Sequence, residues 1–167
     1  PARHLKLLEI GCGEGRDAVF FARNGYDVTA FDIVPDGIKR FFPDTELIHA
    51  GWDGGEYYVS NFISPETDLF QTIATEYIKE WEAEFGKGEF YLADSFNEMK
   101  VPFAKKGTQE RFDQIASYGK HLYNSIASAN PDATWVLQGW MFGYQRYIWD
   151  PESIRALFSQ VPDEKML

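Results

Sequence analysis

Three glycines near the start of the chain alternate with other residues at Gly11, Gly13 and Gly15, directly after the apolar run Leu5–Ile10. Glycines at this point let the backbone turn tightly between a strand and a helix and approach a ligand closely. Asp32 ends the next expected strand, where an acidic side chain can bind ribose hydroxyls. The spacing therefore indicates a ligand site at two strand ends, although a plain strand–turn–helix would need the same glycines.

This segment resembles the S-adenosylmethionine-dependent methyltransferases of Rossmann-like fold over residues 1–39. The glycines look like the first motif of that family, and the acidic residue falls where its second strand ends. Nothing after residue 40 resembles the strands that complete the family's pocket. The residues that the resemblance assigns to the amino-acid part and the ribose of the cofactor are Glu9, Gly11, Gly13, Gly15 and Asp32.

A second pair of residues that can do chemistry is Asn97 and Glu98, which follow the apolar stretch Phe90–Ala93. A carboxyl group whose pKa is raised by an aromatic, partly dry pocket can protonate the oxygen of a glycosidic bond. A neighbouring amide can hydrogen-bond a substituent of the sugar. Because an Asn-Glu pair is common, its meaning depends on the sequence around it.

That surrounding sequence, from about residue 41 to 167, resembles glycoside hydrolase family 89, the α-N-acetylglucosaminidases. Several separate segments match in the right order, which is far more specific than one motif. The segments are Phe42-Pro43-Asp44, Gly51-Trp52, Tyr91–Met99, Trp135–Phe142 and Val161–Leu167.

The resemblance implies roles for four residues. Glu98 would be the catalytic acid/base, and Asn97 would hold the substrate. Trp140 and Trp52 would form aromatic walls of the sugar pocket, where a flat indole face can stack on the C–H face of a pyranose; ordinary core tryptophan is the alternative. The implied substrate is a carbohydrate with terminal N-acetylglucosamine, and this reading needs no cofactor or metal. Asp94 is expected to be a structural hydrogen-bond acceptor.

A retaining glycosidase needs a second carboxyl group, the nucleophile, about 5 Å from the acid/base. In the family this residue comes from a later strand, which would lie beyond Leu167. We therefore expect a fragment of a glycosidase that is inactive alone. The resemblance also implies a lysosomal or secreted setting, although residues 1–20 contain no signal peptide.

Apolar runs and helix-capping residues alternate along the chain, which predicts an α/β fold with parallel strands. We expect a partial (β/α) barrel slice, not a closed barrel, preceded by a Rossmann-like βαβ unit. Ser64-Pro65-Glu66, Thr108 and Asp150-Pro151-Glu152 are typical of helix starts, and 51–64 reads as a long loop. The predicted strands are 5–10, 26–31, 46–50, 90–93 and 134–138, and the predicted helices are 16–24, 65–85, 108–130 and one from 151.

Composition divides the chain after Arg40. Residues 1–40 carry equal numbers of acidic and basic side chains, so the whole net charge of −10 belongs to residues 41–167. We predict an incomplete methyltransferase-like segment at 1–40 and a glycosidase barrel segment at 41–167. The acidic surplus disfavours nucleic-acid and acidic membrane partners, and no apolar run is long enough to cross a bilayer.

Three hypotheses follow from the sequence. The first is a fragment of an α-N-acetylglucosaminidase, which rests on several ordered segments. The second is a methyltransferase that uses S-adenosylmethionine, which rests on one complete motif. The third is an inert composite α/β module.

Overall fold

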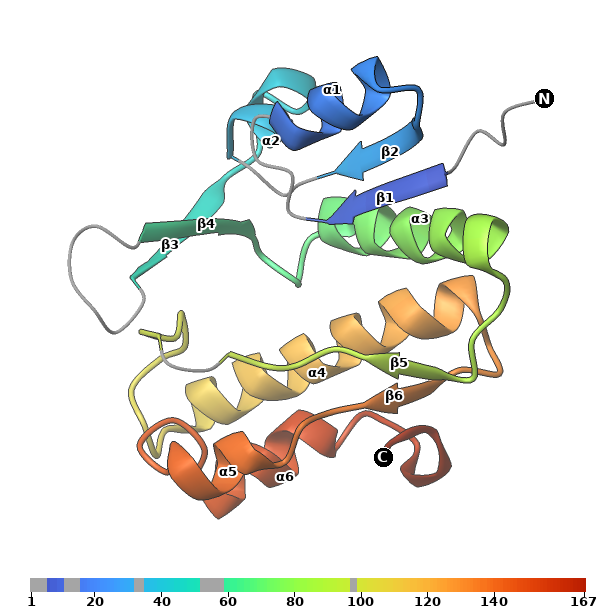
Figure 1. The fold of residues 1–167 in the computed structure, drawn as a ribbon. Coiled ribbons are helices and arrows are strands. Elements are labelled where there is room, and N and C mark those ends of the chain that lie inside the picture. Colours follow the sequence, from blue (N-terminus) through green and yellow to red (C-terminus); the bar gives the residue numbers. More distant parts are fainter. Residues whose placement is uncertain (1–5, 11–15, 32–34, 52–58, 97–98) are drawn as a thin grey trace. The chain divides into compact units, whose positions relative to one another are not determined.

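The computed structural model describes residues 6–10, 16–31, 35–51, 59–96 and 99–167 (Figure 1). The chain divides into two compact units, Pro1–Leu47 and Ile48–Leu167. Both contain parallel strands joined through helices, so the predicted α/β class is confirmed. The division predicted after residue 40, into pieces of two different families, stays a prediction.

The N-terminal unit is built on two parallel strands, β1 (Lys6–Ile10) and β2 (Asp27–Phe31). Their register pairs Ile10 with Phe31, so the two strands end level with each other. Helix α1 (Arg16–Arg23) joins them and packs against β2. This is the βαβ unit that the sequence predicts. It is followed by α2 (Pro35–Phe41), a short helix that the sequence analysis did not predict.

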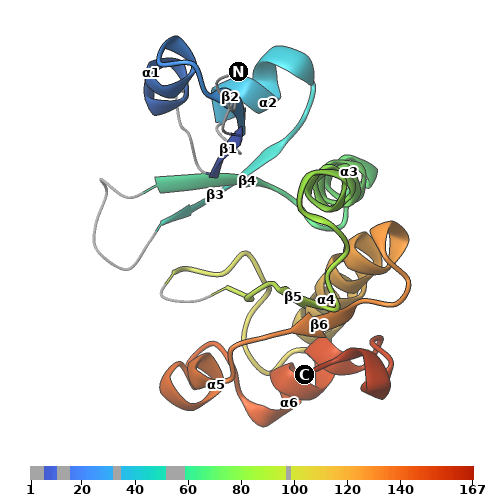
Figure 2. The same ribbon diagram turned by 45° about the vertical axis from the view of Figure 1, so that its right-hand side comes forward.

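The larger unit is organised around a second parallel pair, β5 (Phe90–Leu92) and β6 (Thr134–Val136). Helix α4 (Gln109–Ala129) connects the two strands, and α6 (Pro151–Phe158) follows β6. Helix α4 packs against α6 and against α3 (Asp68–Phe85), and Figure 2 shows α3 and α4 side by side. Long amphipathic helices thus cover the strand pair.

The end of the chain adds a further parallel neighbour to β6. The Leu137 amide donates to the Leu167 carbonyl over 3.0 Å, and the Leu167 amide donates to Trp135 over 2.9 Å. A parallel bridge joins Trp135 to Met166. The preceding turn is a 3₁₀ helix, η1 (Asp163–Lys165). Strand β6 therefore has hydrogen-bonded neighbours on both sides.

Local capping chemistry sets the helix starts. The Thr108 hydroxyl accepts a hydrogen bond from the Arg111 amide, and the Asp150 carboxylate accepts one from Ser153, as the sequence predicts. Helix α3 is different: Thr67, whose hydroxyl accepts from the Phe70 amide, is its N-cap. The predicted start at Ser64–Glu66 was therefore early, because Pro65 and Glu66 lie in the turn before that cap.

Two other predictions need correction. Residues 51–64 are not one long loop, because Val59–Ile63 forms strand β4. The strand predicted at 46–50 is present as β3 (Leu47–Gly51), but its hydrogen-bonded neighbour is β4 and neither parallel pair includes it. Strand β4 was missed because Asn61, a residue disfavoured in strands, interrupts a short apolar run. Helix α5 (Trp140–Tyr144) was also not predicted.

The hydrophobic core of the larger unit lies between β6 and the helices. It includes Ile115, Trp135, Met141, Trp149 and Leu157, all fully or almost fully buried. The other face of β5 is uncovered, since Phe90 and Leu92 are 56% and 61% exposed. None of the helices in the described part of the chain is both long and apolar enough to span a bilayer.

Helices α4 and α6 approach each other closely at Gly119. A Cβ atom at this buried position would overlap the main-chain carbonyl oxygen of Leu157, which cannot move as a flexible side chain can. Gly143, inside α5, has nothing within 4 Å of the position a Cβ would take. The same substitution should therefore have opposite effects at the two glycines.

We expect Gly119→Ala to lower the free energy of unfolding by about 1–3 kcal/mol, because the added methyl group forces the two helices apart. Gly143→Ala should leave it unchanged or raise it by up to about 1 kcal/mol, because alanine favours the helical backbone. Urea unfolding followed by circular dichroism measures both. Equal effects of the two substitutions would contradict the close helix approach.

Candidate functional site

The candidate site lies where β5 and β6 end, because the carboxyl ends of parallel strands carry the chemistry in α/β folds. The segment leaving β5, residues 93–96, is held by the backbone and by two indoles. The Ala93 amide donates to Val136 over 3.1 Å. The Trp135 indole donates to the Ala93 carbonyl over 2.7 Å, and the Trp149 indole donates to Phe96 over 3.0 Å.

Side chains extend the strand pairing beyond the last paired residues. Asp94 Oδ1 accepts a hydrogen bond from the main-chain N–H of Gln138 over 2.9 Å, and Asp94 Oδ2 accepts one from the side-chain Nε2 of Gln138 over 2.8 Å. Gln138 Oε1 in turn accepts a hydrogen bond from the Trp140 indole over 3.2 Å. A continuous hydrogen-bonded bridge thus links the two strand ends, and Asp94 is the structural acceptor that the sequence predicts.

Phe96 anchors the segment in an aromatic cluster. Its ring centroid lies 5.1 Å from that of Tyr118 and 5.4 Å from those of Phe62 and Phe103. Burial and, to a smaller extent, the charge of Asp94 raise the pKa of Tyr118 to about 12, so the phenol stays neutral. A pocket whose lining includes Phe96, Phe103, Tyr118 and Gln114 lies beside the cluster.

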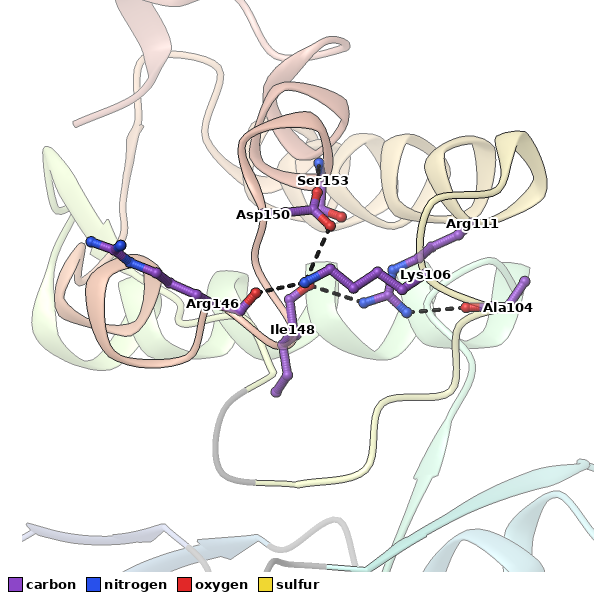
Figure 3. Close-up of polar contacts among 7 residues, drawn as sticks. All are labelled: Ala104, Lys106, Arg111, Arg146, Ile148, Asp150 and Ser153. Carbon is purple, nitrogen blue, oxygen red and sulfur yellow. Dashed lines mark hydrogen bonds and ion pairs between the residues drawn. The ribbon is translucent and has the colours of Figure 1, made fainter.

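The chain that follows Asn97 and Glu98 in the sequence is also held in place, by burial, hydrogen bonds and an ion pair. Met99 is buried, and Lys106 Nζ donates to the Arg146 carbonyl over 2.7 Å and pairs with Asp150 over 3.5 Å (Figure 3). The Arg111 guanidinium, 4% exposed, donates to the carbonyls of Ala104 and Ile148 over 3.1 and 3.0 Å. These contacts join the segment after β5 to the segment between α5 and α6.

We call the contacts of Lys106, Arg111 and Asp150 the clamp, and its charges affect the pKa values of Arg111 and Asp150. Burial lowers the pKa of Arg111, which Asp150 partly offsets. For Asp150 itself, burial favours a higher pKa, but hydrogen bonds from Ser153 and the charge of Lys106 outweigh it and hold the pKa below its ordinary value of 3.8. Asp150 is therefore more stable as a carboxylate in the folded chain than in the unfolded chain.

Most of the site residues predicted from the sequence fall outside the described residues: Gly11, Gly13, Gly15, Asp32, Trp52, Asn97 and Glu98. Glu9 lies in β1. Trp140 is the first residue of α5, directly after the β6 strand end. It is 46% exposed, so it is not an ordinary core tryptophan, unlike Trp135 and Trp149.

Sequence reasoning gave no role to Gln138, which joins Asp94 to Trp140. It also gave none to the indole donors Trp135 and Trp149. In the sequence, Asp94 directly follows the predicted strand 90–93 and Gln138 is the last residue of the predicted strand 134–138, but only the structure gives the register that brings them together. Among the described residues, no three or more His, Cys, Asp or Glu side chains are grouped as a metal site would require.

Comparison with known proteins identifies the larger part of the chain. Residues 28–167 match the family model described as the alpha-N-acetylglucosaminidase (NAGLU) tim-barrel domain. The chain belongs to this family. Human alpha-N-acetylglucosaminidase is 31% identical over 137 residues, which cover 80% of this chain and 18% of the human protein. The chain thus spans about a fifth of the length of that relative.

The N-terminal residues match a second family. Residues 2–48 match the model of the tellurite resistance protein TehB, in agreement with the methyltransferase-like segment predicted from the glycine motif. The two matches overlap over residues 28–48. The predicted resemblance to two families is therefore confirmed.

We expect Asp150→Asn to reduce the free energy of unfolding by about 1 kcal/mol at pH 7, because asparagine keeps the cap but loses the pairing with Lys106. A carboxylate with a lowered folded pKa stabilises the fold above its unfolded value of 3.8 and loses that contribution as pH falls through the folded value. The difference between variant and parent should therefore shrink below about pH 4.

Urea unfolding from pH 7 to pH 2 measures this difference. Asp132→Asn, which neutralises an exposed carboxylate near the end of α4, is the matched control and should leave the stability nearly unchanged. A stability loss in Asp150→Asn that is independent of pH would show that its charge does not stabilise the clamp.

Proposed function

We propose that the chain supplies part of the active site of a glycoside hydrolase that removes terminal α-linked N-acetylglucosamine. The observation that carries this proposal is the family match over residues 28–167. The name of the human relative gives the same substrate class. The held segment 93–96 supports the proposal, because it leads directly to the Asn97–Glu98 pair.

We further propose that the larger unit is a slice of a (β/α) barrel. In a barrel of parallel strands, consecutive strands along the chain are neighbours in the sheet. Strand β5, strand β6 and residues 166–167 follow this order, with α4 and α6 in the two connections. This order supports a barrel and also fits an open parallel sheet.

The uncovered face of β5 favours the barrel. Phe90 and Leu92 point away from the helices that cover the opposite face, and both are more than half exposed. The inward-facing side chains of a barrel fill its interior, where further strands would cover them. We therefore assign Phe90 and Leu92 to the barrel interior.

In the proposed mechanism Glu98 first acts as an acid. It gives its proton to the glycosidic oxygen while a second carboxylate attacks the anomeric carbon, so the bond to the leaving alcohol breaks and a glycosyl ester forms. Glu98 then takes a proton from the water that hydrolyses this ester. Asn97 would hold the sugar, and Trp140 and Trp52 would contact its apolar face. The second carboxylate would come from a strand beyond Leu167, and the chain alone would be inactive.

A second candidate function is binding of S-adenosylmethionine by the N-terminal unit. The parallel pair β1–β2 supports it, because both strands end at the same level, before the glycine motif and before Asp32. The match of residues 2–48 to the TehB model also supports it. Against tight binding, only two parallel strands are described in this unit, and a complete Rossmann-like pocket needs more.

We expect the substitution equivalent to Glu98→Gln in a full-length relative to slow hydrolysis of substrates with poor leaving groups by about 10² to 10⁴-fold, because the proton donor is lost. Aryl substrates with very acidic leaving groups need less protonation, so formation of their glycosyl ester should slow less. Steady-state and single-turnover rates on both substrate types measure this difference.

Glu89→Gln, the same change at an exposed residue just before β5, is the matched control and should leave the rates unchanged. Equal slowing of both substrate types by the Glu98 substitution would exclude the acid/base role. The 167-residue chain itself should not hydrolyse an aryl α-N-acetylglucosaminide. Turnover by it would contradict the absence of a nucleophile.

We expect S-adenosylmethionine to bind the chain with a Kd weaker than about 100 μM, or roughly −5.5 kcal/mol, because its pocket is incomplete. Titration calorimetry with Asp32→Ala and, as control, Asp44→Ala in an exposed loop tests this. Low-micromolar binding that is lost only in Asp32→Ala would instead favour the methyltransferase function.

A further inference from the structure

The hydrogen-bonded bridge between the two strand ends has a fixed direction. An ionised carboxylate only accepts hydrogen bonds, an indole N–H only donates, and a glutamine amide does both. Asp94 therefore requires the Nε2 end of Gln138 to face it, which directs Oε1 toward the Trp140 indole. If the amide were reversed, Oε1 would face the carboxylate and two donors would face each other at the indole.

The carboxylate is itself held by the backbone. Asp94 Oδ1 accepts a hydrogen bond from the main-chain N–H of Gln138 over 2.9 Å, so the Asp94 side chain cannot rotate without losing both of its hydrogen bonds to residue 138. The Trp140 ring also contacts Tyr144, one helical turn later, with the ring centroids 6.3 Å apart. The indole is thus bound at its N–H and packed against a second ring, although 46% of Trp140 is exposed.

We propose that Asp94 and Gln138 are positioning residues that fix the indole of Trp140 as a wall for the N-acetylglucosamine ring. This inference rests on the proposed function and goes beyond it, because it assigns residues that do not touch the sugar. Stacking on a pyranose needs one defined orientation of the indole plane, and an exposed tryptophan without a hydrogen-bond partner would lose rotamer entropy on binding. The bridge makes that ordering part of the folded structure.

The direction of the bridge allows a test by exchange of residues. Gln138→Glu keeps an acceptor for the indole but sets two carboxylates against each other. Asp94→Asn keeps the oxygen that accepts from the main-chain N–H of residue 138, but it sets the side-chain NH₂ of residue 94 against the side-chain NH₂ of Gln138. In the double variant, the amide NH₂ of residue 94 can donate to the carboxylate of residue 138, whose other oxygen accepts from Trp140.

The first measurement uses the 167-residue chain and no sugar. Hydrogen exchange of the Trp140 indole N–H, assigned in ¹H–¹⁵N spectra with Trp140→Phe, should be about 2- to 10-fold faster in each single variant, because the unfavourable contact with residue 94 displaces the side chain of residue 138 from the indole and weakens one hydrogen bond. The double variant should restore the parent rate. Gln109→Glu, in the exposed Gln109–Asp113 pair on α4, is the matched control and should change nothing.

The second measurement uses a full-length relative with the equivalent substitutions. Each single variant should raise KM for an aryl α-N-acetylglucosaminide about 2- to 10-fold with little change in kcat, since the indole contacts substrate and transition state alike. The double variant should recover the parent KM. Adding either single substitution to the equivalent of Trp140→Ala should cause no further loss, because both act through the indole.

The outcomes separate this inference from the proposed function. The positioning role would be overturned if the hydrogen-exchange rate of the indole N–H were the same in the parent, the single variants and the double variant. It would also be overturned if the kinetic losses of the single variants added to that of Trp140→Ala. Indole exchange that follows the prediction while even the Trp140→Ala equivalent leaves KM unchanged would show that Trp140 is not a sugar wall. That second result would contradict the proposed function of Trp140 and leave the bridge itself established.

Discussion

The structure of the candidate site depends on how the four residues after β5 are held. They leave a regular strand, so the backbone ladder no longer satisfies all of their polar groups, and buried groups without partners are costly. Tryptophan indoles from β6 and from the segment before α6 take over this task, at Ala93 and Phe96. Each indole is also part of the hydrophobic core, so the segment is fixed by the same residues that stabilise the unit.

This arrangement gives the two strand ends different kinds of support. The segment after β5 is held by groups that are almost completely shielded from water. The segment after β6 is more open, and its order comes from the carboxylate–amide–indole bridge at the surface. The proposed sugar site would need such an open side, where water can be displaced without disturbing the core.

The sequence predicts those features that depend on neighbouring residues. Caps at Thr108 and Asp150 act within three residues, and the β5–α4–β6 order follows from alternating apolar runs. The Asp94–Gln138 bridge joins residues 44 positions apart, and its formation requires the register of two strands. No local pattern contains that register. Strand β4 was missed for a related reason, because its hydrogen-bonded partner, and not its own residue preference, makes it a strand.

The close approach of α4 and α6 has a mechanical consequence. At Gly119 the main chain of α4 contacts the main chain of α6. No layer of side chains, which could compress or change rotamer, separates the two helices at this point. Packed interiors are stiff, and backbone contacts are their least deformable parts. A shift of α6 is therefore passed to α4 with little damping, and the polar clamp around Asp150 carries it on to the loop at Ala104 and Lys106. We therefore expect α4, α6 and this loop to move together, so that a change in the spacing of the two helices also displaces the loop.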